Sequence, residues 1–376
     1  MIRVDEFEEL LQECGVGFYT GVPDSQLKAF CDFIEDKYGI GDKHIIAPNE
    51  GNAVALATGY HLSTGKYGLV YMQNSGLGNA VNPITSLTDP NVYNVPTVYV
   101  VGWRGQPGVK DEPQHVKQGA ITPDLLELLD IDYKILDEKT TIDEVKQLFD
   151  SDFSKKLANG QSVAFIVSKG AFESFKTKKS NENTLSREDA IKTVIDSLTL
   201  DDIIVSTTGK ASRELFEYRE EKQQGHSNDF LTVGSMGHSS MIALSIALNK
   251  KDKRIFCFDG DGAVLMHMGS LALVGSKSPR NYYHVLFNNC AHETVGGLPT
   301  IMGDINIAEV ALNCGYTNVY HASGKEELES VLEKFLSDNG PVLLIVDVSI
   351  GSRSDLGRPT TTPIENKNAF MKKLEE

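Results

Sequence analysis

The stretch "RIFCFDGDGAVLMHMGSLALVGSKSPRNYYHVLFNNC", residues 254–290, contains two short apolar segments that each end in a small polar turn. The first turn is Gly-Asp-Gly at 260–262, and the second is Asn288-Asn289. Both segments are rich in β-branched and aromatic residues, which predicts buried strands, and the residues between them predict a helix. Parallel strands joined by a helix end at the same edge of a sheet. We therefore expect Asp261 and Asn289 to lie close together there.

Apolar segments of the same kind recur along the whole chain, with helical patterns between them. They predict strands at 17–22, 43–47, 67–72, 95–102, 162–168, 202–206, 254–259, 282–288 and 341–348. Segments that are apolar on both faces, alternating with helices, are typical of parallel sheets with helices on either side. The predicted fold class is α/β.

The chain divides at one long polar stretch, "ESFKTKKSNENTLSRED" at 173–189, which is typical of an exposed linker. We expect a first domain at 1–175, a linker at 176–187 and a second domain at 188–376. A small-residue helix, a charged turn, an apolar strand and a glycine-rich turn follow Gly51 and again follow Gly237, in the same order. This repetition favours two similar domains over a chance match between two ordinary strand–helix units.

Composition excludes several classes of partner and location. The formal charge of −16 and the pI near 5.0 argue against a nucleic-acid surface, which needs clustered basic residues. The five cysteines are scattered, so they favour neither a zinc site nor a disulfide framework, and they suit a reducing cytoplasm. The first 14 residues predict an amphipathic helix and not a signal peptide, and no apolar run is long enough to span a membrane. We expect a cytoplasmic protein with no membrane partner.

The residues of the opening stretch suit a metal bound to a phosphate. The Asp261 carboxylate and the Asn289 amide are hard oxygen ligands of the kind that Mg²⁺ prefers. Gly260 and Gly262 allow a large anion to approach the backbone, and a helix predicted to begin near Ala263 offers its amides to a phosphate. We therefore predict a site for Mg²⁺ and a diphosphate.

Gly-Asp-Gly followed by Asn-Asn at this separation resembles the cofactor motif of the thiamine diphosphate-dependent 2-oxo acid decarboxylases. The resemblance implies two similar domains of the thiamine diphosphate-binding type, with Mg²⁺ held by Asp261, Asn289 and the carbonyl of Ala291. Ala291, after Cys290, stands where many members have Gly, so the local backbone can differ here, although a carbonyl ligand does not require Gly. Cys290 offers a thiol for oxidation. The segment "VGSMGHSS" at 233–240 implies further cofactor contacts from Gly234, Ser235 and Met236, and Met236 is the apolar side chain under the bent cofactor.

The same resemblance assigns the first domain to the pyrimidine ring and the second to the diphosphate. The segment "APNEGNAVALATGYHL" at 47–62 implies that Glu50 contacts the pyrimidine and promotes loss of the thiazolium C2 proton. An acid in the first turn of a helix, favoured by the helix dipole, is the plainer interpretation of Glu50. We expect Glu50 and Asp261 to occupy comparable places in the two halves. In the family the two domain types come from different subunits, so we expect a homodimer or larger homo-oligomer with active sites at the subunit interface.

The expected layout, with two domains only, most resembles family members that act on 3-phosphonopyruvate, and next those that act on 3-sulfopyruvate. The resemblance also lies in the segments at 20–31, 111–115, 288–300 and 351–363. The first activity would release CO₂ and phosphonoacetaldehyde in phosphonate biosynthesis. A small anionic 2-oxo acid needs cations in its site, and an arginine fork suits a phosphonate. The candidate cations are Arg353, Arg358, Lys210 and Arg213, and the candidate proton-handling groups are Asp24, His115 and His292. Surface ion pairs and structural hydrogen bonds are their alternative roles.

Two other functions also fit part of the sequence. "IFCFDGDGA" is similar to the first motif of a haloacid-dehalogenase-type phosphatase, with Asp259 as nucleophile and Asp261 as acid. In that fold the motif normally lies at the first strand, whereas here it lies deep in the second half. A non-catalytic protein that binds thiamine diphosphate is the other alternative, and the presence of Glu50 counts against it.

Overall fold

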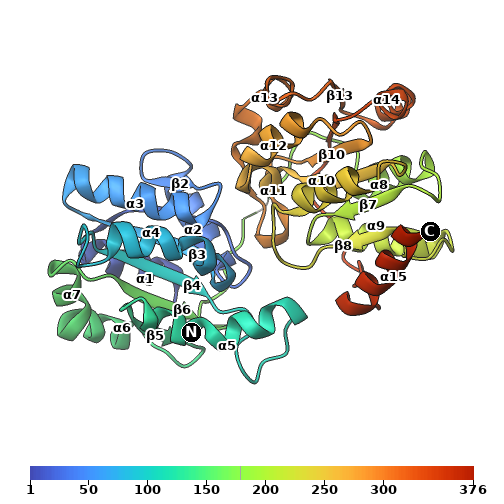
Figure 1. Cartoon of the computed structure of the whole chain (residues 1–376). Coiled ribbons are helices and arrows are strands. Elements are labelled where there is room, and N and C mark those ends of the chain that lie inside the picture. Colours follow the sequence, from blue (N-terminus) through green and yellow to red (C-terminus); the bar gives the residue numbers. More distant parts are fainter. Residues whose placement is uncertain (178) are drawn as a thin grey trace. The chain divides into compact units, whose positions relative to one another are not determined.

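The computed structural model describes residues 1–177 and 179–376. The chain divides into two compact units, Met1–Lys178 and Lys179–Glu376, each built on a six-stranded sheet (Figure 1). All the pairings in both sheets are parallel. The predicted α/β class with two similar domains is confirmed.

The sheet of the first unit has the order β2-β1-β3-β4-β6-β5. Its strands are β1 (Val16–Gly21), β2 (His44–Ile46), β3 (Tyr67–Gln73), β4 (Thr97–Gly102), β5 (Asp132–Leu136) and β6 (Val163–Val167). Its helices are α1 (Val4–Glu13), α2 (Lys28–Tyr38), α3 (Glu50–Thr64), α4 (Leu77–Pro83), α5 (Pro113–Leu128), α6 (Ile142–Leu148) and α7 (Ser154–Ala158).

Apolar side chains alternate across the first sheet, so both of its faces are covered. Val70 and Val101 face α3, α4 and α5, which pack on one side. Phe165 faces the other side, where its ring contacts Phe7 of α1 and Phe149 just after α6. The strands β4 and β6 are buried along their whole length, which explains their continuous apolar sequences.

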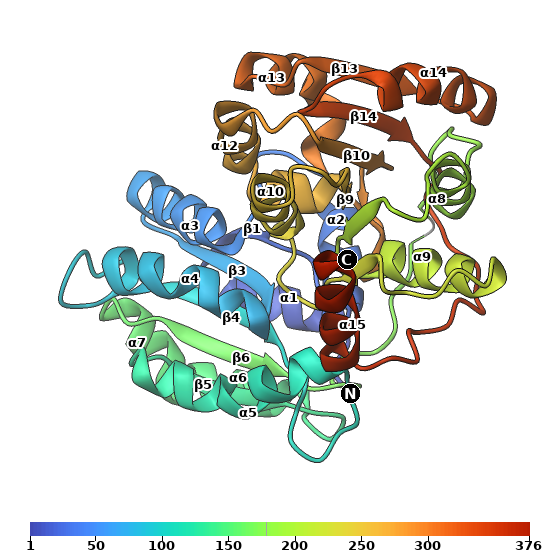
Figure 2. The same ribbon diagram turned by 45° about the vertical axis from the view of Figure 1, so that its right-hand side comes forward.

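The sheet of the second unit has the order β13-β14-β10-β9-β7-β8. Its strands are β7 (Ile203–Ser206), β8 (Asp229–Leu231), β9 (Ile255–Gly260), β10 (Tyr282–Asn288), β13 (Asn318–Ala322) and β14 (Val342–Asp347), and the short β11 (Ala291–His292) and β12 (Leu298–Pro299) form a separate pair. Its helices are α8 (Arg187–Asp196), α9 (Lys210–Glu221), α10 (Ser239–Asn249), α11 (Asp261–Met266), α12 (Gly269–Lys277), α13 (Ile307–Cys314), α14 (Lys325–Ser337) and α15 (Pro363–Glu375). Helices α8, α9 and α14 cover one face, and α10 to α13 with α15 cover the other (Figure 2).

The two sheets have the same strand order when both are followed along the chain. In each unit the second strand of the chain lies at one edge and the fifth at the other, and β3 of the first unit corresponds to β9 of the second. Three strands that we did not predict, β5, β8 and β13, are all edge strands.

The segment expected as a linker is partly built into the second unit. Leu185 is buried, and its carbonyl accepts a hydrogen bond from the Ser349 N–H at 2.8 Å. Asn183 donates to the carbonyl of Val348 at 3.0 Å. The polar composition of this segment therefore reflects hydrogen bonds to the second unit as well as exposure to water.

Candidate active site

Asp261 and Asn289 meet at the carboxyl edge of the second sheet, as predicted. The strands β9 and β10 are neighbours with Gly260 opposite Phe287, so Asp261, one residue beyond this pair, and Asn289, two residues beyond it, both lie at the ends of adjacent strands. The backbone N–H of Ala291 donates to Oδ1 of Asn289 at 3.0 Å, and the same N–H lies near enough to the Asp261 carboxylate to act toward a lower pKa of that group. One N–H group thus faces both predicted ligands.

The surroundings of Asp261 suit a bound cation. The side chain is buried, its Oδ2 accepts from Oγ1 of Thr300 at 2.5 Å, and burial raises its pKa to about 6. Pro299 lies opposite Ala291 in the β11–β12 pair and has no N–H to donate to the Ala291 carbonyl. A carboxylate, an amide oxygen and this carbonyl form an oxygen-only donor set, which fits Mg²⁺.

The glycines beside Asp261 have different surroundings. A Cβ on Gly260 would meet nothing within 4 Å, whereas a Cβ on Gly262 would lie 3.1 Å from two atoms of the His292 ring. His292 is half-buried, and desolvation lowers its pKa to about 4. Helix α11 begins at Asp261, two residues before the predicted start, so Ala263 lies within it.

The predicted cofactor turn before α10 has an unusual backbone. Gly234, Ser235 and Gly237 have φ angles of 69°, 47° and 84°, all in the left-handed region. Met236, between them, is half-buried. The turn is fixed on the sheet side by the Gly234 N–H, which donates to Oγ1 of Thr208 at 3.0 Å.

Cys290 adopts a backbone conformation that favours glycine. Its φ is 53°, in the left-handed region that few residues other than glycine adopt. The loop that holds Asn289 thus adopts this conformation at a cysteine. Burial raises the pKa of the Cys290 thiol, so the thiolate that oxidants attack is scarce.

In the first unit, Glu50 is a buried acid at the first position of α3. Its Oε2 accepts a hydrogen bond from Nδ2 of Asn79 at 2.8 Å. Gly76 packs directly against it, because a Cβ added there would lie 2.5 Å from Cγ of Glu50. The carboxylate is therefore held in one place by an amide donor and by the absence of a side chain at position 76.

Glu50 and Asp261 do not occupy comparable places in the two units, and this expectation was wrong. Asp261 is the first residue after β9, and the residue in the same place after β3 is Asn74. Glu50 begins the helix before β3, which corresponds to the start of α10 after Met236. The two halves repeat a fold, but their acids lie at opposite ends of the repeated helix–strand segment.

Asp24 lies in a buried loop beyond β1. Its Oδ1 accepts from Nε2 of Gln73 at 2.7 Å and its Oδ2 accepts from the N–H of Gln26 at 2.6 Å. Burial raises the pKa of Asp24. Gly102 at the end of β4 leaves room for this carboxylate, because a Cβ there would lie 2.5 Å from Oδ2.

His115 is linked to the same edge of the sheet through an ion pair. Its Nδ1 lies 3.1 Å from Oδ1 of Asp111, and Nε of Arg104 donates to Oδ2 of Asp111 at 2.8 Å. The Arg104 guanidinium holds the pKa of Asp111 well below its usual range, and Arg104 also donates to Oγ of Ser25 at 3.0 Å. Because Ser25 follows Asp24 directly, the structure brings Asp24 and His115 to one edge.

The four predicted substrate cations have different surroundings. Nζ of Lys210 pairs with Glu293 at 2.9 Å, next to Asn289. Arg353 pairs with Glu188 and Glu217. Arg358 is exposed and Arg213 is half-buried. The acids that pair with Lys210 and Arg353 were not predicted from the sequence, and neither was the buried Arg187, which pairs with Glu214 and Glu293.

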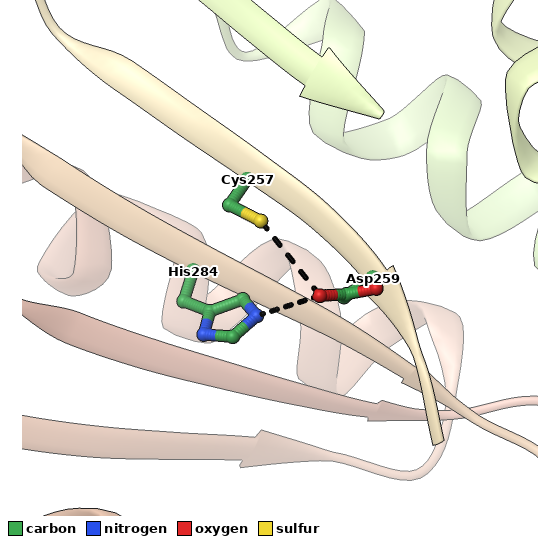
Figure 3. A group of neighbouring side chains, drawn as sticks. All are labelled: Cys257, Asp259 and His284. Carbon is green, nitrogen blue, oxygen red and sulfur yellow. Dashed lines mark hydrogen bonds and ion pairs between the residues drawn. The ribbon is translucent and has the colours of Figure 1, made fainter. Parts of the chain in front are cut away.

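A second cluster of polar side chains lies inside the second unit (Figure 3). Cys257 and Asp259 on β9 and His284 on β10 point to the same face, with 3.9 Å between Sγ and Oδ2 and 3.6 Å between Nε2 and Oδ2. These three side chains are fewer than the four ligands of a closed structural zinc site. Asp259 is only 1% exposed, so it is shielded from any phosphate ester and does not suit a phosphatase nucleophile.

Comparison with known proteins identifies the family. Residues 4–128 match the N-terminal TPP binding domain of thiamine pyrophosphate enzymes, and residues 207–346 match the C-terminal TPP binding domain. The chain belongs to the thiamine pyrophosphate enzyme family and uses thiamine pyrophosphate, also called thiamine diphosphate. In the part of the chain that the structure describes, every helix is too short or too polar to cross a membrane.

Within this family the chain is similar to two curated decarboxylases along nearly its whole length. It is 33% identical to phosphonopyruvate decarboxylase of Streptomyces viridochromogenes, over 98% of this chain and 94% of that protein. It is 32% identical to phosphonopyruvate decarboxylase of Streptomyces hygroscopicus, over 98% and 93%. It is 26% identical to sulfopyruvate decarboxylase of Methanosarcina acetivorans, over 87% and 86%.

Proposed function

We propose that this enzyme uses thiamine diphosphate and Mg²⁺ to decarboxylate 3-phosphonopyruvate to phosphonoacetaldehyde and CO₂, as a step of phosphonate biosynthesis. The observation that carries the proposal is the convergence of Asp261 and Asn289 on the N–H of Ala291. The similarity to two phosphonopyruvate decarboxylases over nearly the whole chain supports the choice of substrate.

The metal and the diphosphate would be held by the second unit. Asp261, Asn289 and the Ala291 carbonyl would bind Mg²⁺, which leaves further positions of an octahedral ion for phosphate oxygens. Gly260 has open space beside it, which suits the approach of a large anion. The half-buried Met236 is the proposed apolar contact of the cofactor, in a turn with Gly234 and Ser235.

Three residues of the first unit would handle protons. When bound, thiamine diphosphate accepts the electron pair that is left when the C1–C2 bond of the 2-oxo acid breaks. Glu50 would hold the proton exchanged with the pyrimidine ring, in a position fixed by Asn79. Asp24 and His115 would supply the proton that the aldehyde carbon takes up after CO₂ leaves, and His292 of the second unit is the remaining candidate.

The phosphonate group needs a cation, and Lys210, Arg213, Arg353 and Arg358 remain the proposed set. Lys210 and Asn289 both hydrogen-bond to Glu293, which places Lys210 close to the proposed metal site. The anionic sulfonate of 3-sulfopyruvate also needs a cation in the site. The similarity to a sulfopyruvate decarboxylase therefore supports that acid as the second candidate substrate.

We also propose a homo-oligomer of at least two chains. Leu62 on the outer side of α3 is 72% exposed, and nearby Phe18, Ala55 and Tyr60 line a shallow apolar hollow. A helix with apolar residues on its outer side as well as toward the core is typical of one covered by another surface. Analytical ultracentrifugation should find dimers or larger species, and a monomer at assay concentrations would contradict the proposal.

The five cysteines of the chain are all free thiols. This supports the cytoplasm as the compartment of the proposed reaction, because free thiols persist in a reducing environment. No nucleic-acid partner is proposed, in line with the net charge of −16.

The test is CO₂ release from 3-phosphonopyruvate, with 3-sulfopyruvate and pyruvate in parallel, before and after removal of Mg²⁺ and thiamine diphosphate. We expect release that depends on both cofactors and is strongest with 3-phosphonopyruvate. Glu50→Gln should lower turnover at least about 100-fold while thiamine diphosphate still binds, because a proton-transfer group is lost. Preference for 3-sulfopyruvate would overturn the substrate, and unchanged turnover of Glu50→Gln would overturn the role of Glu50.

A further inference from the structure

Every polar atom of the Asn289 side chain has a partner. Its Oδ1 accepts from the N–H of Ala291 at 3.0 Å, and its Nδ2 donates to Oε2 of Glu293 at 2.9 Å. Its backbone carbonyl accepts from Nδ2 of Asn181 at 3.2 Å. The residue is buried, so these contacts are not replaced by water and they fix its orientation.

Glu293 is itself held by two cations. Arg187 donates from Nη1 to Oε2 at 2.8 Å, and Lys210 donates from Nζ to Oε1 at 2.9 Å. Arg187 is held on its other side by two hydrogen bonds of 2.7 Å to Glu214. Two cations and two carboxylates balance in charge, which is what a buried ion network needs to be stable.

The direction of the Asn289–Glu293 hydrogen bond decides which end of the amide faces Asp261. An asparagine amide has an acceptor end and a donor end of similar size, and only the oxygen can bind a cation. A carboxylate can only accept, so Glu293 selects the NH₂ end of Asn289. The oxygen is then left on the side of Ala291 and Asp261.

We propose that Glu293 is a positioning residue that holds Asn289 with its Oδ1 toward the metal, and that Arg187 and Lys210 hold Glu293 in place. The inference rests on the proposed metal site at Asp261 and Asn289. It gives Lys210 a structural part in this site in addition to its candidate contact with substrate. Arg187 begins α8, so the segment that opens the second unit also supports the metal ligand.

The experiment measures the affinity of the purified full-length enzyme for Mn²⁺, as a spectroscopic substitute for Mg²⁺, with saturating thiamine diphosphate. Glu293→Gln should weaken Mn²⁺ binding about 10- to 100-fold, the usual effect of losing a partner of a metal ligand. Glu214→Gln is the matched control, because it perturbs the same ion network without touching Asn289, and it should change the affinity less than about threefold. Equal losses in the two variants would overturn the proposal, since both would then reflect general damage to the network.

A second pair of variants tests the direct contact. Asn289→Asp places a carboxylate against Glu293, so it should weaken Mn²⁺ binding, and adding Glu293→Gln should restore part of the loss because the glutamine can donate to the new aspartate. Additive losses in the double variant would overturn the inference. If the unaltered enzyme decarboxylates and binds Mn²⁺ but Glu293→Gln binds it equally well, only the positioning role fails. If the unaltered enzyme binds no Mn²⁺, the metal site of the proposed function fails with it.

Discussion

Replacing Gly76 with alanine should move the Glu50 carboxylate without altering Glu50 itself. The backbone at Gly76 is in the ordinary right-handed helical region, so alanine is allowed there. Its Cβ would lie 2.5 Å from Cγ and 2.6 Å from Cδ of Glu50, whereas carbon atoms in contact are about 3.5–4.0 Å apart. Glu50 must therefore shift by about 1 Å, and its hydrogen bond to Asn79 is stretched or lost.

The expected cost falls on catalysis and not on folding. A displacement of about 1 Å at a reacting group can cost about 100-fold in rate, which corresponds to about 2.7 kcal/mol of transition-state stabilisation. The clashing atoms belong to a flexible side chain, so the free energy of unfolding should fall by less than about 2 kcal/mol. We expect kcat/KM for CO₂ release from 3-phosphonopyruvate to fall about 100-fold with a small change in Tm.

Gly78→Ala is the matched control, because Gly78 lies only two residues further on, in α4, and a Cβ there would meet nothing within 4 Å. It should keep the kcat/KM of the unaltered enzyme. Steady-state CO₂ release and thermal unfolding of the two variants decide the matter. Wild-type kcat/KM in Gly76→Ala would refute the reasoning, because the position of the Glu50 carboxylate would then be irrelevant to the rate.

Three further outcomes follow from the structure. Burial lowers the pKa of His44 to about 4 from an ordinary value near 6.5, so the unfolded state binds the proton more readily than the folded state. The free energy of unfolding should therefore fall by up to about 3 kcal/mol as the pH drops from 7 to 4. Denaturant unfolding of His44→Gln should lack this part of the pH dependence. Gly275→Ala should lower Tm by several degrees, since its Cβ would lie 2.5 Å from the carbonyl carbon of Cys314, while Gly269→Ala in the same helix meets nothing and should not. Exhaustive chelation should abolish CO₂ release, which Mg²⁺ should restore; full activity after chelation would argue against the metal site.

Most strands that the sequence predicts are buried on both faces, and the edge strand β2, with its apolar pair Ile45-Ile46, is the exception. Strands such as β4 and β9 carry continuous apolar runs because helices cover both of their sides. β5, β8 and β13 lie at sheet edges, and most residues of β5 and β13 are half-buried or exposed, so their sequences lack such runs. These three strands form because they hydrogen-bond to a neighbouring strand, and their local sequence does not reveal that neighbour.

Some residues of the candidate site could likewise be predicted from the sequence, and others could not. Asp261 and Asn289 could be placed together because each lies just past a predicted strand of one strand–helix–strand unit. The support of Asn289 could not be predicted, since Arg187 lies 106 positions from Glu293 and pairs with it only after α8 and α9 have packed on the sheet. Similarly, the role of Gly76 could not be predicted, because the Glu50 side chain occupies the space beside it only in the folded chain.

The shared strand order of the two sheets bears on how many ligands one chain can bind. A chain with two copies of one fold could in principle hold two equivalent ligands, one at each carboxyl edge. However, the amide of Asn74, at the place of Asp261, is fully engaged, because its Nδ2 donates to the Arg104 carbonyl and to Thr122 and its Oδ1 accepts from the Arg104 N–H. Titration calorimetry should therefore count one thiamine diphosphate per chain, and two per chain would show that the edge at Asn74 also binds the cofactor.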